Sequence, residues 1–363
     1  KVGPPDWLVD ALRDEGRWPV PRLEGVVESP VLLPSGEVLQ QPGYHADSGL
    51  LYAPPPGVKF LDVPQKPCAA DIERAQRWLN EAVCDFPFEQ PWHRSAWKAG
   101  VLSYFARWAY TGQTPFFLID ANVRGSGKTR LAMTAALTSL GREPMIIDQA
   151  HDDDDEKRLI TSVAMSGEMM VLIDNIARPF GTAKFDSMLT KGTWDAVLLY
   201  RNDPVRFPMN AVWWGNGNNV EFRAHADTVR RTLRIRLDSP MQNPERRHDF
   251  RHKDLLGWIS ENRDHLVLSA LTLLRGFIVA GCPAQHLPTW GGFEGWSALV
   301  REAVVWAGDP DPYDAAAGHD DSSDVVAEAL GDLLRGWSEL CEATHSERSE
   351  ERRVGKECLR LCR

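Results

Sequence analysis

The chain has 363 residues, of which 43% are hydrophobic and 25% are charged, as in an ordinary globular protein of about two or three domains. Its formal net charge of −10 argues against a surface coated in positive charge for nucleic acid, although a local basic channel is compatible with it. No apolar run is long enough to span a membrane. The 6 cysteines include no Cys-x-x-Cys pair, so we expect neither a zinc site nor a disulfide framework, and a reduced cytoplasmic setting.

Residues 1–65 contain short runs of valine, leucine and tyrosine between proline- and glycine-rich turns. Turn signals such as Pro-Ser-Gly and Asp-Ser-Gly between such runs are typical of small antiparallel sheets. We therefore expect a small β-rich N-terminal region here. Because the sequence begins at Lys1 without a methionine, we also expect it to be a fragment whose upstream part is missing.

Residues 66–112 are predicted to form a helical subdomain, because apolar residues recur at three- and four-residue spacing. The run DIERAQRWLNEAVCDF indicates one helix, with Asp71 as its N-cap. The run SAWKAGVLSYFARWAYTG indicates a second helix, which Gly112 would end.

Residues 113–245 alternate apolar runs with helical patterns. The runs PFFLID, PMIID, MMVLID and NAVWWGN are predicted strands, and helical patterns follow the first three. Such alternation predicts an α/β core with a mostly parallel sheet covered by helices. Residues 196–209 interrupt the pattern with two extended runs that flank Asn-Asp-Pro, which predicts a hairpin between the third and fourth strands.

Residues 246–346 are predicted to form a helical C-terminal region, within which DPDPYDAAAGHDDSSD is expected to be an exposed acidic linker. Residues 347–363 change abruptly to high charge density with little apolar periodicity. We expect a disordered tail, or one that is not native to the protein. A basic nucleic-acid-binding tail is the alternative.

The stretch LIDANVRGSGKTRLAM contains a candidate phosphate-binding loop. Gly125 and Gly127 let the backbone approach phosphate oxygens closely, and a helix from about Lys128 points its N-terminal amides at the anion. The Lys128 ammonium suits β- and γ-phosphates, and the Thr129 hydroxyl suits Mg²⁺. The alternative is a chance match on a surface turn, which the preceding strand and following helix disfavour.

Asn122 stands where the standard loop pattern has its first glycine. Asparagine tolerates a left-handed backbone better than most residues, so we expect the turn to form. The predicted ligand is ATP with Mg²⁺. The residues predicted to bind it are Asn122, Gly125, Ser126, Gly127, Lys128, Thr129 and Arg130.

Asp174 ends an apolar strand, and a carboxylate at a strand end beside a phosphate loop can hold Mg²⁺ through its water shell. A turn-capping aspartate is the alternative. The next residue, Asn175, cannot take a proton from water, so another carboxylate would have to activate it. The acidic run Asp152 to Glu156 supplies candidates, with Glu156 preferred, although a solvated acidic helix start explains the run as well.

Asn218 lies at the end of the fourth predicted strand, where an amide can sense the γ-phosphate or orient water. Asn216 and Asn219 are alternates, and a plain Gly/Asn turn is the competing interpretation. Arg230 and Arg231 are candidates for an arginine finger that reaches the γ-phosphate of a neighbouring subunit. A salt-bridged surface is the alternative for this pair.

The order of these motifs resembles that of the AAA+ helicase domains of phage and plasmid replication proteins, which relate to the superfamily-three helicases. The resemblance covers roughly residues 20–305, and its most specific parts are GSGKT, VLIDN, GNN and RHKDLLGW. It implies a P-loop NTPase (AAA+-like) core with a helical N-terminal preamble and a helical C-terminal region. It also implies a homo-oligomer, typically a hexameric ring around single-stranded DNA, and a primase module upstream.

The resemblance assigns Lys128 and Thr129 to the phosphate loop, Asp174 to the Mg²⁺ site and Asn218 to the sensor position. It assigns Arg230 or Arg231 to the finger. In related helicases a DNA-gripping loop occupies the position of the predicted hairpin, so Lys191 and Arg201 would face the pore. An ordinary surface hairpin is the alternative.

We therefore expect an ATP-hydrolysing DNA helicase or translocase motor of a mobile-element replication protein. Two other functions stay open. One is an ATP-dependent protein remodeller or switch, for instance in phage defence. The other is a nucleotide-binding scaffold with weak turnover, for which Asn122 and Asn175 would be signs of lost activity.

Overall fold

The computed structural model describes residues 3–15, 20–123, 125–197, 204–223, 226–239, 247, 249–316, 333–335 and 337. Contacts group Lys1–Ala317 into one compact unit and Gly318–Arg363 into a second, of which the few described residues are helical. The predicted tail, residues 347–363, lies outside the described residues. The boundaries proposed above between regions of the chain stay predictions.

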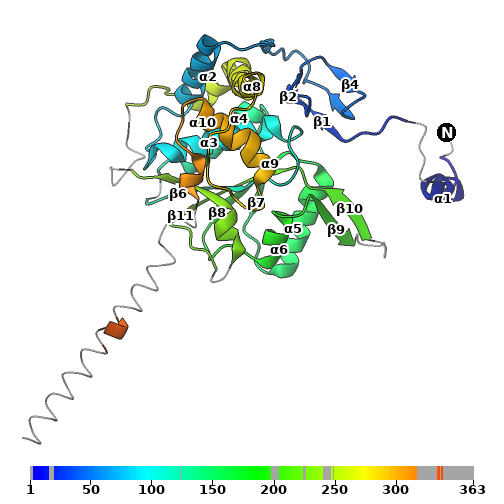
Figure 1. Ribbon diagram of the computed structural model, residues 1–363. Coiled ribbons are helices and arrows are strands. Elements are labelled where there is room, and N and C mark those ends of the chain that lie inside the picture. The colour runs from blue at the N-terminus through cyan, green and yellow to red at the C-terminus, as the bar shows by residue number, and fades with distance from the viewer. Residues whose placement is uncertain are drawn as a thin grey trace, which may run out of the picture. The chain divides into compact units, whose positions relative to one another are not determined.

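A five-stranded sheet forms the centre of the first unit (Figure 1). Its strand order is β12-β6-β11-β8-β7, and every neighbouring pair is parallel. The strands are β6 (Phe116–Ala121), β7 (Met145–Asp148), β8 (Met170–Ile176), β11 (Val212–Asn218) and β12 (Thr232–Leu237). The predicted α/β class and parallel sheet are confirmed. The fifth strand, β12 with the sequence TLRIRL, is not among the predicted strands, because its two arginines and the preceding Arg230 and Arg231 are typical of a charged surface segment.

Side chains alternate across the sheet and feed two hydrophobic clusters. Phe117 and Ile119 of β6 pack with the first cluster, and Phe116 and Leu118 of the same strand pack with the second. A strand buried on both faces must be apolar throughout, which is why β6 is a continuous apolar run up to Asp120. Helices therefore cover both faces of the sheet.

The larger cluster is built from the helices of the N-terminal and C-terminal segments together with the helix that follows β6. These helices are α2 (Ala69–Glu81), α3 (Pro91–Ala106), α4 (Lys128–Ser139), α7 (Leu255–Glu261), α8 (Arg263–Val279), α9 (Glu294–Trp296) and α10 (Glu302–Trp306), with a π-helical turn, Ser297–Arg301, between the last two. The opposite face is covered by α5 (Asp153–Ser166) and α6 (Ala183–Met188). Figure 1 shows α5 and α6 together, apart from the α2, α8 and α10 layer.

The first 65 residues form two small β units, as predicted, but the pairing is not purely antiparallel. Strand β5 (Leu50–Tyr52) pairs parallel to β1 (Gly25–Val27) and antiparallel to β4 (Gly43–His45). A separate antiparallel ribbon joins β2 (Val31–Leu32) to β3 (Val38–Leu39). The short helix α1 (Asp6–Glu15) precedes them, and its Trp7 is exposed.

Two helix boundaries differ from the sequence prediction. Helix α2 has Cys68 rather than Asp71 as its N-cap, and Asp71 accepts a hydrogen bond from the Cys68 backbone N–H at 2.9 Å. Asp71 therefore serves the third position of a capping box, where a carboxylate satisfies the same orphan amide. Helix α3 ends at Ala106 rather than at Gly112, which closes the turn after it with φ +94°.

The acidic segment after α10 is not an exposed linker over its first eight residues. Asp309 accepts hydrogen bonds from the fully buried Lys98 ammonium at 2.7 and 2.8 Å, and Asp311 binds the buried Arg301 at 2.6 Å. A 3-10 turn, Pro312–Ala315, then leads to Ala316, which bridges to β12. The carboxylates are drawn inward because each compensates a buried cation, which would be costly alone.

The predicted hairpin is confirmed. Strand β9 (Thr193–Val197) pairs antiparallel to β10 (Pro204–Pro208), and Asp195 and Arg206 form an ion pair across it at 2.7 Å. Lys191 is exposed just before β9, whereas Arg201 lies outside the described residues. In the described part of the chain, no helix combines the length and the apolar character needed to cross a bilayer.

Candidate nucleotide-binding site

The loop between β6 and α4 has the backbone that a phosphate-binding loop needs. Gly125 and Gly127 both have left-handed φ angles, +76° and +91°, and Gly127 is the N-cap of α4. The φ angle favours glycine at position 127, and a Cβ there would also make a tight contact of 3.2 Å with the Phe86 ring. The predicted start of α4 at Lys128 is confirmed, and its first amides are directed back into the loop.

Asn122 does not fill its position in the way expected from the sequence. The described non-glycine residues with positive φ include Asn175 and Asn219 but not Asn122, so a left-handed backbone is not the reason for this asparagine. Its side-chain amide instead donates a hydrogen bond to Asp238 Oδ1, just beyond β12. Its side-chain oxygen accepts from the Ser239 backbone N–H at 3.4 Å.

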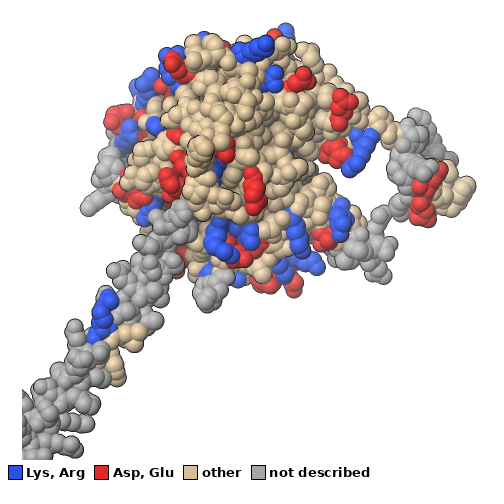
Figure 2. Space-filling view, in the orientation of Figure 1, with Lys and Arg blue, Asp and Glu red and all other residues tan. Residues whose placement is uncertain are grey.

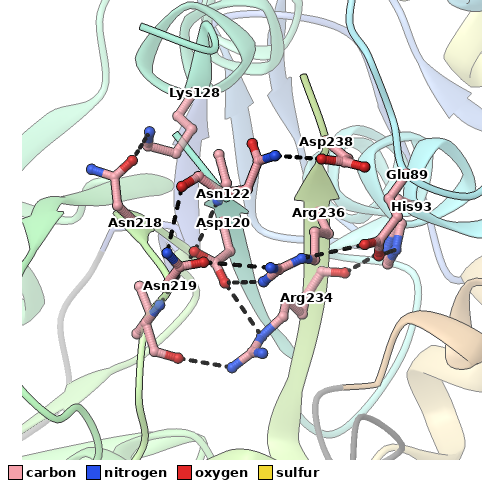
Figure 3. Close-up of polar contacts among 12 residues, drawn as sticks. Glu89, His93, Asp120, Asn122, Lys128, Asn218, Asn219, Arg234, Arg236 and Asp238 are labelled. Atoms are coloured by element: carbon pink, nitrogen blue, oxygen red, sulfur yellow. Dashed lines mark hydrogen bonds and ion pairs between the residues drawn. The ribbon is translucent and has the colours of Figure 1, made fainter. Parts of the chain in front are cut away.

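Lys128 and Asn218 lie together although they are distant in the sequence (Figure 3). The Lys128 ammonium donates to Asn218 Oδ1 at 2.6 Å and is 3.4 Å from Ser126 Oγ. Strand β11 lies beside β6 in the sheet, with Asn218 opposite Ala121, which carries the end of β11 to the loop. Arg130 is exposed on the first turn of α4.

Asn216 links the two residues predicted to hold Mg²⁺. Its side-chain amide donates to Asp174 Oδ1 at 2.7 Å and is 3.4 Å from Thr129 Oγ1. Asn216 is buried, and β11 lies between the strand that precedes the loop and the strand that carries Asp174. From the sequence, Asn216 is only an alternate sensor, because local pattern does not reveal that β11 lies between β6 and β8.

Asn175 has a backbone role. Its φ angle is +53°, its side chain is exposed, and its N–H donates to Asn216 Oδ1 at 2.9 Å. Pairing of β8 with β11 shifts register at this level, between Gly215 and Gly217. An asparagine that tolerates the left-handed region therefore accommodates this irregularity within β8, directly after Asp174, while its amide stays bonded.

Glu156 does not join this set of side chains. Helix α5 follows β7, which is the far edge strand of the sheet, separated from β6 by β8 and β11. The Glu156 carboxylate accepts a hydrogen bond from the Thr182 hydroxyl and lines a cleft with residues 179–182 and Arg223. Burial raises its pKa. The acidic run begins the helix as the competing interpretation held, with Asp152 as N-cap.

The candidate finger residues differ in exposure. The Arg230 side chain is 74% exposed and pairs with Asp227 in the 3-10 turn Asp227–Arg231, which precedes β12. The Arg231 side chain is only 20% exposed and lies 3.6 Å from the same carboxylate. Both arginines precede β12 and lie at the opposite end of this strand from Asp238.

Another group of polar side chains gathers at and just after the end of α2. Glu81, Cys84 and His252 have potential metal-ligand atoms within 4.8 Å of one another. The spacing of the cysteines in the sequence does not indicate this group. Glu81 Oε1 already lies 2.6 Å from Arg251 Nε and 2.8 Å from His252 Nε2. Burial also raises the pKa of the Cys84 thiol, which disfavours the thiolate that binds metals. These contacts tie α2 to the segment before α7.

On the face shown in Figure 2, Lys and Arg side chains lie among Asp and Glu side chains rather than forming one basic surface. This mixture agrees with the negative net charge. Contacts to nucleic acid would therefore have to come from a local element of the fold.

No model of a known protein family matches the chain, and no curated protein does. Similar solved structures include the C-terminal region of NrS-1, at 14% identity and a TM-score of 0.42, covering 74% of this chain and 60% of that chain. They also include the JCV helicase, at 14% identity and a TM-score of 0.26, covering 66% of each chain. The SCCmec type IV Cch helicase matches at 12% identity and a TM-score of 0.37, covering 90% of this chain and 62% of that chain.

The chain thus spans less than two thirds of the NrS-1 and Cch chains. Identities and scores of this size carry no argument about activity. The fold class rests on the order of the parallel strands and on the strand–loop–helix unit of this chain itself.

Proposed function

We propose that this chain is an ATP-dependent motor that moves on single-stranded DNA. The observation that carries the proposal is the convergence of Lys128, Asn218, Asp174, Asn216 and Thr129 at the carboxyl edge of one parallel sheet, beside a loop with two left-handed glycines. In open α/β sheets ligands bind at this edge.

The residues present fit ATP with Mg²⁺. Gly125 and Gly127 allow the loop amides to turn toward phosphate oxygens, and the start of α4 adds the positive end of a helix dipole. The Lys128 ammonium would pair with the terminal phosphates. Thr129 and Asp174, which Asn216 joins, would hold the ion; bound Mg²⁺ would neutralise charge on the phosphates.

Asn218 would report the state of the nucleotide. Its oxygen accepts from the Lys128 ammonium, the group that would contact the terminal phosphate, so a phosphate that draws Lys128 away frees the Asn218 amide to turn. Because Asn218 ends β11, such a change would pass to the turn that follows the strand. This is the residue-level basis for a nucleotide-dependent movement.

We further propose that the chain works as a homo-oligomeric ring, with Arg230 reaching a neighbour's nucleotide. Support comes from its exposure, because a finger must extend beyond its own subunit. The β9–β10 hairpin, with exposed Lys191 before it, is the element proposed to contact DNA. A primase module upstream completes the proposal for a mobile-element replication protein.

The proposal is tested by ATP turnover with and without single-stranded DNA. We expect DNA to stimulate turnover. Lys128→Ala should lower the stimulated rate about 100-fold or more, because it removes the positive charge that would pair with the terminal phosphates. Lys157→Ala, which removes an exposed lysine of α5, is the matched control and should behave as wild type.

The outcomes separate the competing functions. ATP turnover that is indifferent to DNA contradicts the motor and favours a protein remodeller or switch. Nucleotide binding without turnover, with or without DNA, favours a scaffold. Absence of any nucleotide binding by the folded wild-type chain removes all three.

A further inference from the structure

Asn122 makes contacts that glycine cannot make. The strand β6 ends at Ala121, and the Asn122 side chain bonds both the Asp238 carboxylate and the Ser239 backbone N–H directly after β12. The two parallel strands are therefore fastened at the level where the phosphate loop begins. A glycine at this position would leave the loop attached to β12 by strand pairing alone.

Two residues before Asn122, Asp120 is a fully buried carboxylate in β6. Its Oδ1 accepts from the backbone N–H groups of Ala121 at 2.9 Å and Val220 at 3.2 Å. Its Oδ2 lies 3.0 Å from Arg236 Nη1, which stands opposite it in β12. A buried carboxylate is costly unless it is paired and hydrogen-bonded, so Asp120 holds β12 and the turn after β11 against β6.

The Arg236 guanidinium extends this network toward the nucleotide site (Figure 3). It lies 3.5 Å from Glu89 and donates to Asn219 Oδ1 at 3.4 Å. Asn219 has a left-handed backbone, with φ +47°, and its N–H donates to the Ala121 carbonyl at 3.2 Å. Since Asn219 directly follows Asn218, the network helps to fix the residue that contacts Lys128.

We infer that Asp120, Asn122, Arg236 and Asp238 are positioning residues of the nucleotide site, and that Asn122 is required there in place of glycine. They set where the phosphate loop leaves β6 and where Asn218 meets Lys128. The inference rests on the proposed nucleotide binding. Its specific consequence is that restoring the standard glycine, Asn122→Gly, weakens nucleotide binding instead of improving it.

The test measures the Kd of a fluorescent ATP analogue with Mg²⁺, together with the unfolding midpoint of each variant. We expect Asn122→Gly and Asp238→Ala each to weaken binding about 10-fold, the usual effect of losing one hydrogen bond to a charged group. The double variant should bind no more weakly than Asn122→Gly, because that single variant already lacks the contact that Asp238→Ala removes. Glu168→Ala, which removes a partly exposed carboxylate partner of Arg142, is the matched control with unchanged Kd.

A reciprocal exchange distinguishes positioning from general stability. Asn122→Asp alone places two carboxylates together and should weaken binding, whereas Asn122→Asp combined with Asp238→Asn reverses the hydrogen bond and should restore it. If wild type binds the analogue and folded Asn122→Gly binds it equally or more tightly, or the exchange fails to restore binding, the inference is overturned. If wild type itself does not bind, the proposed function fails instead.

Discussion

The asparagines around the phosphate loop have different physical roles. Asn175 and Asn219 supply left-handed backbone, Asn216 bridges Asp174 and Thr129, and Asn218 contacts Lys128. Asn122 fastens the loop to β12. A small amide side chain can do all of these because it tolerates positive φ and both donates and accepts hydrogen bonds.

Glu156 gives a prediction at the residue scale. Burial raises its pKa in the folded chain, so ionisation is favoured in the unfolded chain. Its contribution to stability is fully present below the ordinary pKa of about 4.3 and is lost as pH rises through the raised value. Glu156→Gln should remove this loss and make the chain more stable than wild type near neutral pH.

Urea unfolding midpoints measured from about pH 4 to pH 8 check this prediction. The difference between Glu156→Gln and wild type should grow as pH rises. Glu143→Gln, at an exposed position, controls for the removal of one carboxylate. A constant difference across the pH range would contradict the raised pKa of Glu156. Glu156 would then be ionised near neutral pH and able to act as a base.

At the scale of elements, contact between α3 and β11 places the polar end of β11. Gly100 in α3 faces Trp214, and a Cβ on Gly100 would lie 2.3 Å from the indole Cζ2. The glycine lets the helix approach the sheet closely enough for this large ring to be fully buried. Trp214 is two residues before Asn216, so the packing of the helix bears directly on the site.

Gly100→Ala should therefore destabilise the chain by about 1–3 kcal/mol, because a buried indole cannot move aside. Gly276→Ala in α8 is the matched comparison, since its nearest contact is the flexible Cδ1 of Ile72 at 2.5 Å. It should cost less, because the end of the Ile72 side chain can move aside, whereas the gain of about 1 kcal/mol for alanine over glycine in a helix applies to both positions. Equal free energies of unfolding for the two variants would contradict the close-approach role of Gly100.

At the scale of the whole molecule, the proposed ring predicts that assembly completes each nucleotide site. The exposed Arg230 lies at the start of β12, and the contacts of Asn122 lie at its end. If neighbouring subunits share sites, mixtures of Arg230→Ala and Lys128→Ala chains form composite sites with an intact loop facing an intact arginine. Such mixtures should recover part of the DNA-stimulated ATP turnover that each variant lacks alone.

The matched control mixes Arg230→Ala with the double variant Lys128→Ala/Arg230→Ala, which contains no intact arginine and should show no recovery. The same pair of mixtures with Arg231→Ala tests the less exposed candidate. Oligomer formation by every variant is checked by sedimentation. Assembled mixtures that recover no activity for either arginine would exclude a finger acting between subunits.

Much of the fold followed from local pattern. Strands β6, β7, β8 and β11 are apolar runs, and such runs are stable only in a sheet that is covered on both faces. Gly125 and Gly127 have left-handed φ angles, which residues with a side chain rarely adopt. Strand β12 is not recognisable from the sequence because its arginines, Arg234 buried and Arg236 partly buried, pair with Asp120, a compensation that sequence cannot display. The first part of the acidic segment is not an exposed linker, because Asp309 pairs with Lys98, which is distant in the chain.

The sequence by itself determined the α/β class, and it singled out Lys128, Thr129 and Asp174 as candidates for the proposed nucleotide site, because these depend on periodicity and on residues adjacent in the chain. Only the tertiary structure decided that β11 lies between β6 and β8, which brings Asn216 and Asn218 to the loop and leaves Glu156 at the far edge. It also decided the role of Asn122, because the partner that explains this residue, Asp238, comes to it only when β12 pairs with β6.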